Sequence, residues 1–211
     1  MKSLKSTKDN INVTYKSDFL SKELSDEYYN ILESNLVYNS AEESKVTVFG
    51  KQYLIPRKQV AYGESGTFYT FAGVTVNAID WNIDNDTTNA IQTIKQKVEE
   101  FTNETFNFVL INRYANGTEY IGKHRDDEKD LDKKSVIVGV SLGAPRDVVF
   151  APYRFIPEET SKRSTINLAH GSVFVMYYPT NEHWTHEIPK RAGVSKPRVS
   201  LTFRKMVIKN Q

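Results

Sequence analysis

The sequence contains no cysteine and only four histidines among its 211 residues. Without thiols the chain can form no disulfide, no iron–sulfur cluster and no thiolate zinc site, so any bound metal must use His, Asp or Glu. Neither sign of charge dominates, because 28 basic and 26 acidic residues leave a net charge of +2. That balance does not by itself predict nucleic-acid binding, which needs a local basic patch.

Long apolar runs are also lacking. Residues 1–8 are basic, but no hydrophobic stretch follows them, which argues against a signal peptide and against a membrane span. No internal repeat or low-complexity linker interrupts the chain. A length of 211 residues, of which 39% are hydrophobic, is typical of one globular domain, so we expect residues 1–211 to form a single domain.

Two amphipathic helices are expected. Apolar side chains recur at helical spacing within residues 17–36, where Ser17 or Asp18 is the expected N-cap. The same spacing recurs from residue 86 to about residue 102, with Asp86 or Thr87 as the expected cap. Both stripes indicate helices that cover a sheet.

Short strands separated by turns follow the second helix, from residue 106 to residue 207. Residues 1–16, by contrast, are predicted to be a polar lead with one short apolar alternation at Ile11 and Val13. Helices followed by a series of strands indicate an α+β fold, with a sandwich or jelly roll flanked by helices.

Residues 45–55 are predicted to form a β-hairpin, because apolar residues alternate with polar ones around a turn at Gly50. Phe49 then lies at or near the tip, where an aromatic side chain is unusual. It either folds back onto the core or acts as a wedge that enters a duplex beside an extruded base. Further on, Tyr69 and Phe71 share one face of an aromatic strand, where they either pack in the core or stack a flat substrate.

His124 and Asp126 are two residues apart, so on a strand both side chains point to the same side. Two histidines and one carboxylate on one face of a metal form the ligand set of non-haem Fe(II) oxygenases. The alternative is a solvated charged turn, since His124 opens a run of charged residues. Spacing alone does not choose the second histidine among His170, His183 and His186.

The last strand carries Arg198, Ser200, Thr202 and Arg204 on one face, opposite an apolar face. Two guanidinium groups with small hydroxyls between them indicate an anion clamp, because arginine pairs with carboxylates through a bidentate fork. A plain solvent-facing strand is the alternative, although lysine or glutamate would be more typical of it.

Together these motifs resemble the AlkB family of Fe(II)- and 2-oxoglutarate-dependent dioxygenases, over roughly residues 45–206. The resemblance rests on Asn112-Arg113-Tyr114, His124-Arg125-Asp126-Asp127-Glu128, Asn181-x-His183-Trp184-x-His186, and Pro197-Arg198-Val199-x-Leu201-Thr202-Phe203-Arg204. Within the family, the chain most resembles the homologue that repairs alkylated double-stranded DNA. That likeness is carried by Val48-Phe49-Gly50-Lys51, Pro56-Arg57-Lys58-Gln59, Tyr62-Gly63, Tyr69-Thr70-Phe71 and Ala169-His170-Gly171-Ser172.

The resemblance implies roles for individual residues. His124, Asp126 and His186 match the metal ligands, and the 2-oxoglutarate contacts match Asn112, Tyr114, Arg198, Thr202 and Arg204. We expect Arg204 to neutralise the distal carboxylate of 2-oxoglutarate. The residues that match substrate contacts are Phe49, Arg57, Tyr69, Phe71, Asp127 and Glu128. Phe71 and His124 would stack on the damaged base, and the match favours the wedge for Phe49.

The resemblance also implies a fold and its divisions. The family fold is a double-stranded β-helix, or jelly roll, with a nucleotide-recognition lid of hairpins ahead of it. The expected divisions are an N-terminal extension and helix at 1–44, the lid at 45–84, a supporting helix at 85–105 and the jelly-roll core at 106–207.

The chemistry implied is oxidative dealkylation of DNA bases with lesions of the 1-methyladenine and 3-methylcytosine type. Fe(II), 2-oxoglutarate and dioxygen are the cofactor and co-substrates, and succinate, CO2 and formaldehyde are the products. The expected partner is alkylated DNA, preferably double-stranded, reached by base flipping. A basic rim could contact phosphates through Lys51, Arg57, Lys58, Lys162, Arg163, Lys190, Arg191 and Lys196.

Two other functions remain open. One is a demethylase of the same family that acts on single-stranded DNA or RNA, or an oxygenase of protein side chains. The other is a non-catalytic jelly-roll binding module with a vestigial metal site. We expect a monomer with no membrane contact and no obligate protein partner, nuclear if the source is eukaryotic and otherwise cytoplasmic.

Overall fold

The structure is a computed structural model that describes residues 1–6, 9–48, 50–71, 74–153 and 163–207. Phe49, at the expected hairpin tip, and Lys162, in the expected basic rim, lie outside the described residues, as does the side chain of Phe71. Their predicted roles stay predictions.

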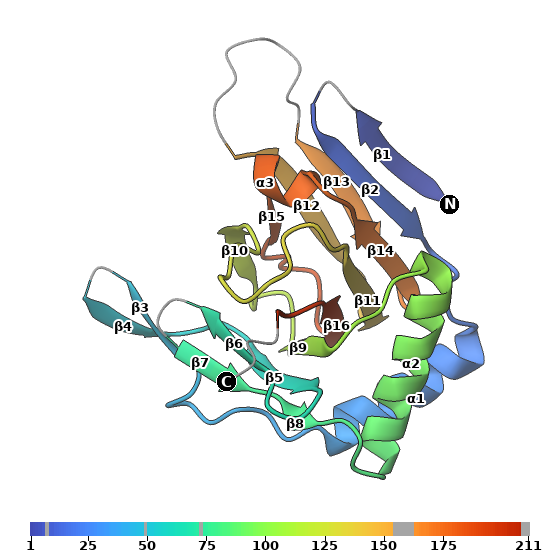
Figure 1. Cartoon of the computed structure of the whole chain (residues 1–211), viewed down its shortest axis with the longest axis vertical. Helices are drawn as coiled ribbons and strands as arrows, with labels where there is room; N and C mark the ends of the chain where they lie inside the picture. The colour runs from blue at the N-terminus through green and yellow to red at the C-terminus, as the bar shows by residue number, and fades with distance from the viewer. Residues whose placement is uncertain (7–8, 49, 72–73, 154–162, 208–211) are drawn as a thin grey trace.

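A large mixed sheet spans the molecule and carries most of the core (Figure 1). Its strands run in the order β1 (Lys2–Ser6), β2 (Ile11–Lys16), β14 (Ser172–Met176), β11 (Ile137–Gly143), β16 (Arg198–Arg204), β9 (Phe108–Tyr114), β5 (Lys58–Gly63) and β8 (Ile79–Asp80). All of these pairings are antiparallel except that of β5 with β8. Strands that are far apart in the chain are thus neighbours in space.

A smaller sheet faces the inner side of the large one. Its order is β10 (Ile121–His124), β15 (Trp184–Ile188), β12 (Arg146–Pro152) and β13 (Ser164–Leu168). Phe108 and Leu110 of the large sheet pack with Val148, Phe150 and other residues of the small sheet in one apolar cluster. Two facing antiparallel sheets around one core form the predicted jelly roll.

Two helices cover the outer face of the large sheet, α1 (Lys22–Asn35) and α2 (Asp86–Thr102) (Figure 1). Leu32 of α1 and Ile91 and Ile94 of α2 are fully buried against strand residues in a second apolar cluster. Both helices were predicted, but the predicted caps were wrong. Ser21 caps α1 and Asn85 caps α2, since their side chains accept from backbone N–H groups one turn ahead.

The prediction of a polar lead at residues 1–16 was also wrong. β1 and β2 form a hairpin, and β2 pairs with β14, so the N-terminus extends the large sheet. Ile11, Val13 and Tyr15 are buried on its inner face. The apolar alternation at Ile11 and Val13 was therefore the visible part of a complete strand.

Two further hairpins precede β9 in the chain, β3 (Lys45–Val48) with β4 (Lys51–Leu54), and β6 (Phe68–Phe71) with β7 (Val74–Asn77). The first was predicted at these residues. We call the two hairpins together the lid. A short helix, α3 (Thr180–His183), precedes β15. Across the described ranges, no helix has the length and apolar character needed to cross a bilayer.

Candidate metal and 2-oxoglutarate site

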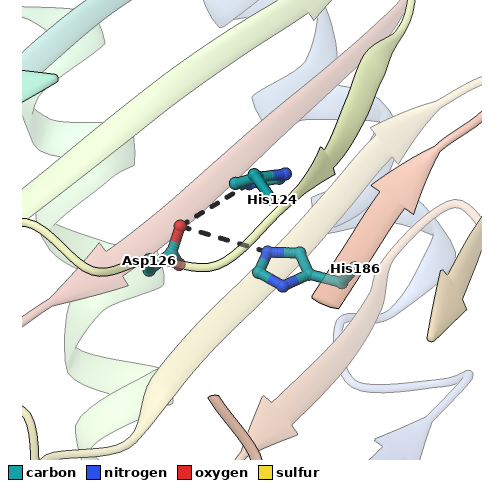
Figure 2. Close-up of side chains that lie close together, drawn as sticks. All are labelled: His124, Asp126 and His186. Carbon is teal, nitrogen blue, oxygen red and sulfur yellow. Dashed lines mark ion pairs between the residues drawn. The ribbon is translucent and has the colours of Figure 1, made fainter. Parts of the chain in front are cut away.

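The three predicted metal ligands converge on one point between the sheets (Figure 2). His124 ends β10 and is the cross-strand partner of His186 in β15, while Asp126 follows just beyond β10. Their ligand atoms all lie within 4.8 Å of one another, with His124 Nε2 3.6 Å and His186 Nε2 4.0 Å from Asp126 Oδ1. Two imidazoles and one carboxylate at these separations fit one divalent metal.

One backbone contact and burial give the two histidines the tautomer and the protonation state that metal binding needs. His124 Nδ1 lies 2.9 Å from the carbonyl oxygen of Gly122, which selects the tautomer that leaves the Nε2 lone pair free on the Asp126 side. Burial lowers the pKa of His124, and burial together with His124 lowers the pKa of His186 to about 3. Both imidazoles are therefore neutral at neutral pH, as metal binding requires.

Asp126 is kept as a carboxylate although it is buried. Burial alone would raise its pKa, but Arg204 and the two histidines outweigh burial, so the pKa lies below its usual range. Arg204 Nη2 donates to Asp126 Oδ1 at 2.9 Å. The carboxylate is thus charged, oriented and still open towards the histidines.

The structure also resolves the choice among the histidines. His170 is occupied elsewhere, because its Nδ1 accepts from the Gly143 N–H and its Nε2 lies 3.1 Å from Asp26 Oδ1. His183 is exposed in α3. Only His186 joins His124 and Asp126 in a potential metal site among the described residues.

Next to the ligands, a small inner cavity of about 60 Å³ is lined by the predicted anion clamp. Arg198 is 1% exposed, and its Nη2 donates to the hydroxyls of Ser141 and Ser200. Its Nε and Nη1 have no partner in the described structure, and burial lowers its pKa to about 10. A buried cation with free donors is costly unless an anion binds it, so this end of the cavity fits a carboxylate of 2-oxoglutarate.

The other predicted 2-oxoglutarate contacts line the same cavity: Asn112, Tyr114, Thr202 and Arg204. Asn112 is buried, and its Oδ1 accepts from Arg57 Nε at 2.7 Å. The Arg198 guanidinium carbon lies 5.4 Å from the centre of the Tyr114 ring. The alternation predicted for the last strand is confirmed, because Val199, Leu201 and Phe203 face the helices instead.

Arg204 lies at one end of this cavity, beside the metal ligand Asp126. Arg204 was expected at the distal carboxylate of 2-oxoglutarate, but its guanidinium lies at the metal end. It pairs with Asp126, and its Nη1 is 3.7 Å from Glu128 Oε1. Arg198 and Arg204 each have two nitrogens without a hydrogen-bond partner among the described residues. Only Arg204 pairs with carboxylates there, so the cation whose charge is left unbalanced is Arg198, at the opposite end of β16.

Above the ligands opens a larger cavity of about 1120 Å³, between β10, the segment that follows it and the lid. Four predicted substrate residues with described side chains line it: Arg57, Tyr69, Asp127 and Glu128. Glu128 lies low in this cavity beside Arg204, and burial raises its pKa. Asp127 is mostly exposed at the mouth, where its Oδ2 accepts from Arg125 Nη2.

Several lining residues were not predicted. Tyr53, Leu54 and Phe68 present exposed apolar side chains from the lid to the large cavity. Arg146, which was not predicted either, does not line a cavity but is buried behind one: it is 1% exposed, donates to the carbonyls of Asn116, Glu119 and Pro189, and packs near the ring of Tyr114, which lines the inner cavity. An arginine at the start of an apolar strand is unusual, and this pattern in the sequence could have identified Arg146.

Comparison with known proteins agrees with this site. Residues 12–204 match the 2OG-Fe(II) oxygenase superfamily. The chain is 43% identical to the DNA oxidative demethylase ALKBH2 of Homo sapiens over 186 residues, which is 87% of this chain and 69% of that protein. The chain belongs to the AlkB family of this superfamily. Fe(II), 2-oxoglutarate and dioxygen are the cofactor and co-substrates of the superfamily, and the three ligands and the free donors of Arg198 fit the first two.

Other members of the AlkB family are also similar to this chain. ALKBH2 of Mus musculus is 42% identical over 185 residues, covering 86% of this chain and 75% of that protein. The alpha-ketoglutarate-dependent dioxygenase alkB homolog 3 of Homo sapiens is 34% identical, covering 72% of this chain and 52% of that protein. The solved structure of OsALKBH1 shares the fold with a TM-score of 0.56 at 16% identity, over 92% of this chain and 97% of that one.

Proposed function

We propose that the protein removes alkyl groups oxidatively from damaged bases in duplex DNA, with lesions of the 1-methyladenine and 3-methylcytosine type as substrates. The observation that carries this proposal is the stacking of two cavities over one metal site, the inner with an anion clamp and the outer large enough for a base. The DNA oxidative demethylase name of ALKBH2, a relative over most of the chain, supports the substrate class.

Each part of the site has a task in this reaction. His124, Asp126 and His186 would hold Fe(II), and Arg198 would bind the distal carboxylate of 2-oxoglutarate, assisted by Asn112, Tyr114 and Thr202. When bound, iron would supply the oxidising chemistry with dioxygen and 2-oxoglutarate as co-substrates: one oxygen atom hydroxylates the alkyl carbon, and the other enters the succinate that forms with CO2. The hydroxylated group then leaves as formaldehyde and restores the base.

Residues of the chain must also hold the damaged base next to the metal site. Tyr69, 6% exposed, forms part of the floor of the large cavity, and Glu128 and Asp127 place acidic groups at the lesion end. A cationic methylated base is favoured beside carboxylates, and it unpairs more cheaply than an intact base. Phe71 and Phe49 keep their predicted roles, as a stacking partner of the base and as a wedge in the duplex.

Cations flank the entrance to the large cavity, which suits a phosphate backbone. The cations that line this cavity are Arg57, Lys123, Arg125 and Lys129. Other residues of the predicted basic rim are exposed elsewhere on the surface: Lys51, Lys58, Arg163, Lys190, Arg191 and Lys196. Arg191 is partly neutralised, because its guanidinium pairs with Asp147 at 2.9 Å. We infer a monomer that acts on DNA, in the nucleus if the source is eukaryotic.

The test is formaldehyde release from one 1-methyladenine oligonucleotide, offered single-stranded and as a duplex, with Fe(II) and 2-oxoglutarate. We expect release from the duplex, none from His186→Ala, and a larger loss on the duplex than on the single strand for Phe49→Ala. Release from the single strand alone would exclude the duplex preference. Release from neither would favour another substrate or the non-catalytic binding module.

A further inference from the structure

Asn181 lies in α3 and has no role in the site as described above. Its side-chain amide makes two hydrogen bonds to the backbone of the metal-ligand residue Asp126. The amide oxygen accepts from the Asp126 N–H at 3.0 Å, and the amide nitrogen donates to the Asp126 carbonyl at 2.5 Å. One side chain thus satisfies both polar groups of a single peptide residue.

This contact begins where strand pairing stops. The ladder between β10 and β15 ends at the pair His124 and His186, and residues 125–128 belong to no strand. A primary amide offers an acceptor and donors like those of a peptide group. Asn181 therefore supplies Asp126 with the pair of hydrogen bonds that a continued antiparallel strand would have given it.

A second contact ties the same two segments together. Arg125 Nη1 donates to the carbonyl oxygen of Glu182, the residue after Asn181, at 3.3 Å. α3 leads directly into β15, the strand that carries His186. The backbone of Asp126 is therefore fixed to the element that positions the third ligand, while Arg204 orients its carboxylate from the other side.

We propose that Asn181 is a positioning residue of the metal centre, which holds the Asp126 backbone so that its carboxylate meets the metal together with His124 and His186. The proposal rests on the proposed function only in that a divalent metal binds these three residues. It does not depend on which nucleic acid or base is the substrate. Partners of metal ligands that fix ligand geometry typically change metal affinity 10–100-fold when they are removed.

The experiment measures the affinity of the full chain for Mn(II) in the absence of DNA. Asn181→Ala removes both hydrogen bonds, and we expect metal binding about 10–100-fold weaker than in the wild type. Asn181→Asp keeps the acceptor but sets an oxygen against the Asp126 carbonyl, so we expect a loss of about tenfold or more. Glu182→Ala is the matched control, because its side chain is exposed on the same short helix and makes no hydrogen bond or ion pair with any residue that the structure describes.

Circular dichroism at the assay temperature separates positioning from a purely structural role. A structural role would lower the unfolding temperature and leave the metal affinity of the folded variants unchanged, and that result would overturn the proposal. If Asn181→Ala does not fold, the affinity of Asn181→Asp decides in the same way. A wild type that binds Mn(II) but releases no formaldehyde would overturn the proposed substrate without touching the comparison between Asn181 variants.

Discussion

At the scale of single residues, Arg198 shows how charge and burial indicate a ligand. Its guanidinium is buried, yet no carboxylate of the described residues pairs with it, and two of its nitrogens have no partner. Arg204 is also buried and also has two nitrogens without a hydrogen-bond partner, but Asp126 and Glu128 raise its pKa, so its charge is already balanced. The difference assigns the incoming anion to Arg198.

Replacing Arg198 should therefore weaken 2-oxoglutarate binding more than metal binding. Charge-assisted hydrogen bonds contribute about 1.5–3 kcal/mol, so we expect the dissociation constant for 2-oxoglutarate to rise roughly 10–100-fold in Arg198→Gln. Arg198→Lys should recover part of this loss, because it keeps the charge but not the planar fork. Anaerobic titration of the Mn(II)-loaded protein measures both constants, and Lys205→Ala, an exposed cation just past β16, is the control.

The depressed histidine pKa values make the metal-free protein sensitive to mild acid. Burial and His124 lower the pKa of His186 to about 3 in the folded chain, against about 6.5 when unfolded. Below pH 6.5 the unfolded chain binds protons that the folded chain does not, so the free energy of unfolding falls as the pH drops towards 3.

Urea unfolding in the presence of a chelator, at pH 7.5 and pH 5.5, measures this effect. The wild type should lose stability over that interval, and His186→Gln, which cannot titrate there, should lose less. An equal loss in both proteins would show that other groups are responsible.

Individual site residues could be predicted where a local rule determines the direction in which a side chain points. Residues an even number of positions apart on a strand share a face, which is why Arg198 and Arg204 were predicted together. His124 and Asp126 converge as predicted, but Asp126 lies just beyond the strand and not on it. The rule says nothing about which neighbours a side chain meets. The balance of charge around Arg204, and the pairing of Asn181 with Asp126, depend on segments far apart in the chain and were therefore missed.

At the scale of elements, amphipathic spacing identified both helices and most strands, but it misplaced their ends. A cap depends on one side chain reaching a backbone N–H, and several polar residues near each helix start were equally suitable by type. The N-terminal hairpin was missed because β1 is mostly polar and exposed, as expected of an edge strand. Its partner β2 alone carries the buried alternation.

The N-terminal hairpin should contribute measurably to stability if it belongs to the jelly roll. Val13 is fully buried on β2, and Trp184 Nε1 donates to the carbonyl of Asp9 nearby in the chain. We expect Val13→Ala to lower the free energy of unfolding by about 1–3 kcal/mol, because it leaves a cavity in the core. Thr14→Ala, half-buried on the opposite face of the same strand, should cost less, and denaturant unfolding compares the two.

At the scale of the whole molecule, the sequence predicted the architecture because a jelly roll needs only a series of short strands with helices alongside. It did not predict which strands belong to which of the two sheets, since the strand order joins distant segments such as β2 with β14. The functional site lies between these sheets: the metal ligands come from β10, the segment after it and β15 of the small sheet, and the anion clamp comes from β16 of the large sheet. Binding at that point should stabilise both sheets together.

Thermal unfolding tests this coupling. A ligand at 100 times its dissociation constant stabilises a folded protein by about 2.7 kcal/mol. Mn(II) and 2-oxoglutarate together should therefore raise the unfolding temperature by several degrees in a single transition. His186→Ala should show a much smaller rise, whereas a rise of the same size would place the stabilising metal elsewhere.

β10 is an edge strand, because among the described residues it pairs only with β15. The large cavity opens beside it, lined by residues 121–124 of this strand and by residues of the lid. The lid hairpins line the same cavity but contribute none of the three metal ligands, so their residues can change without altering the strands that carry the ligands. The lid hairpins are accordingly the part of the protein in which a new substrate preference could arise while the oxidising centre stays the same.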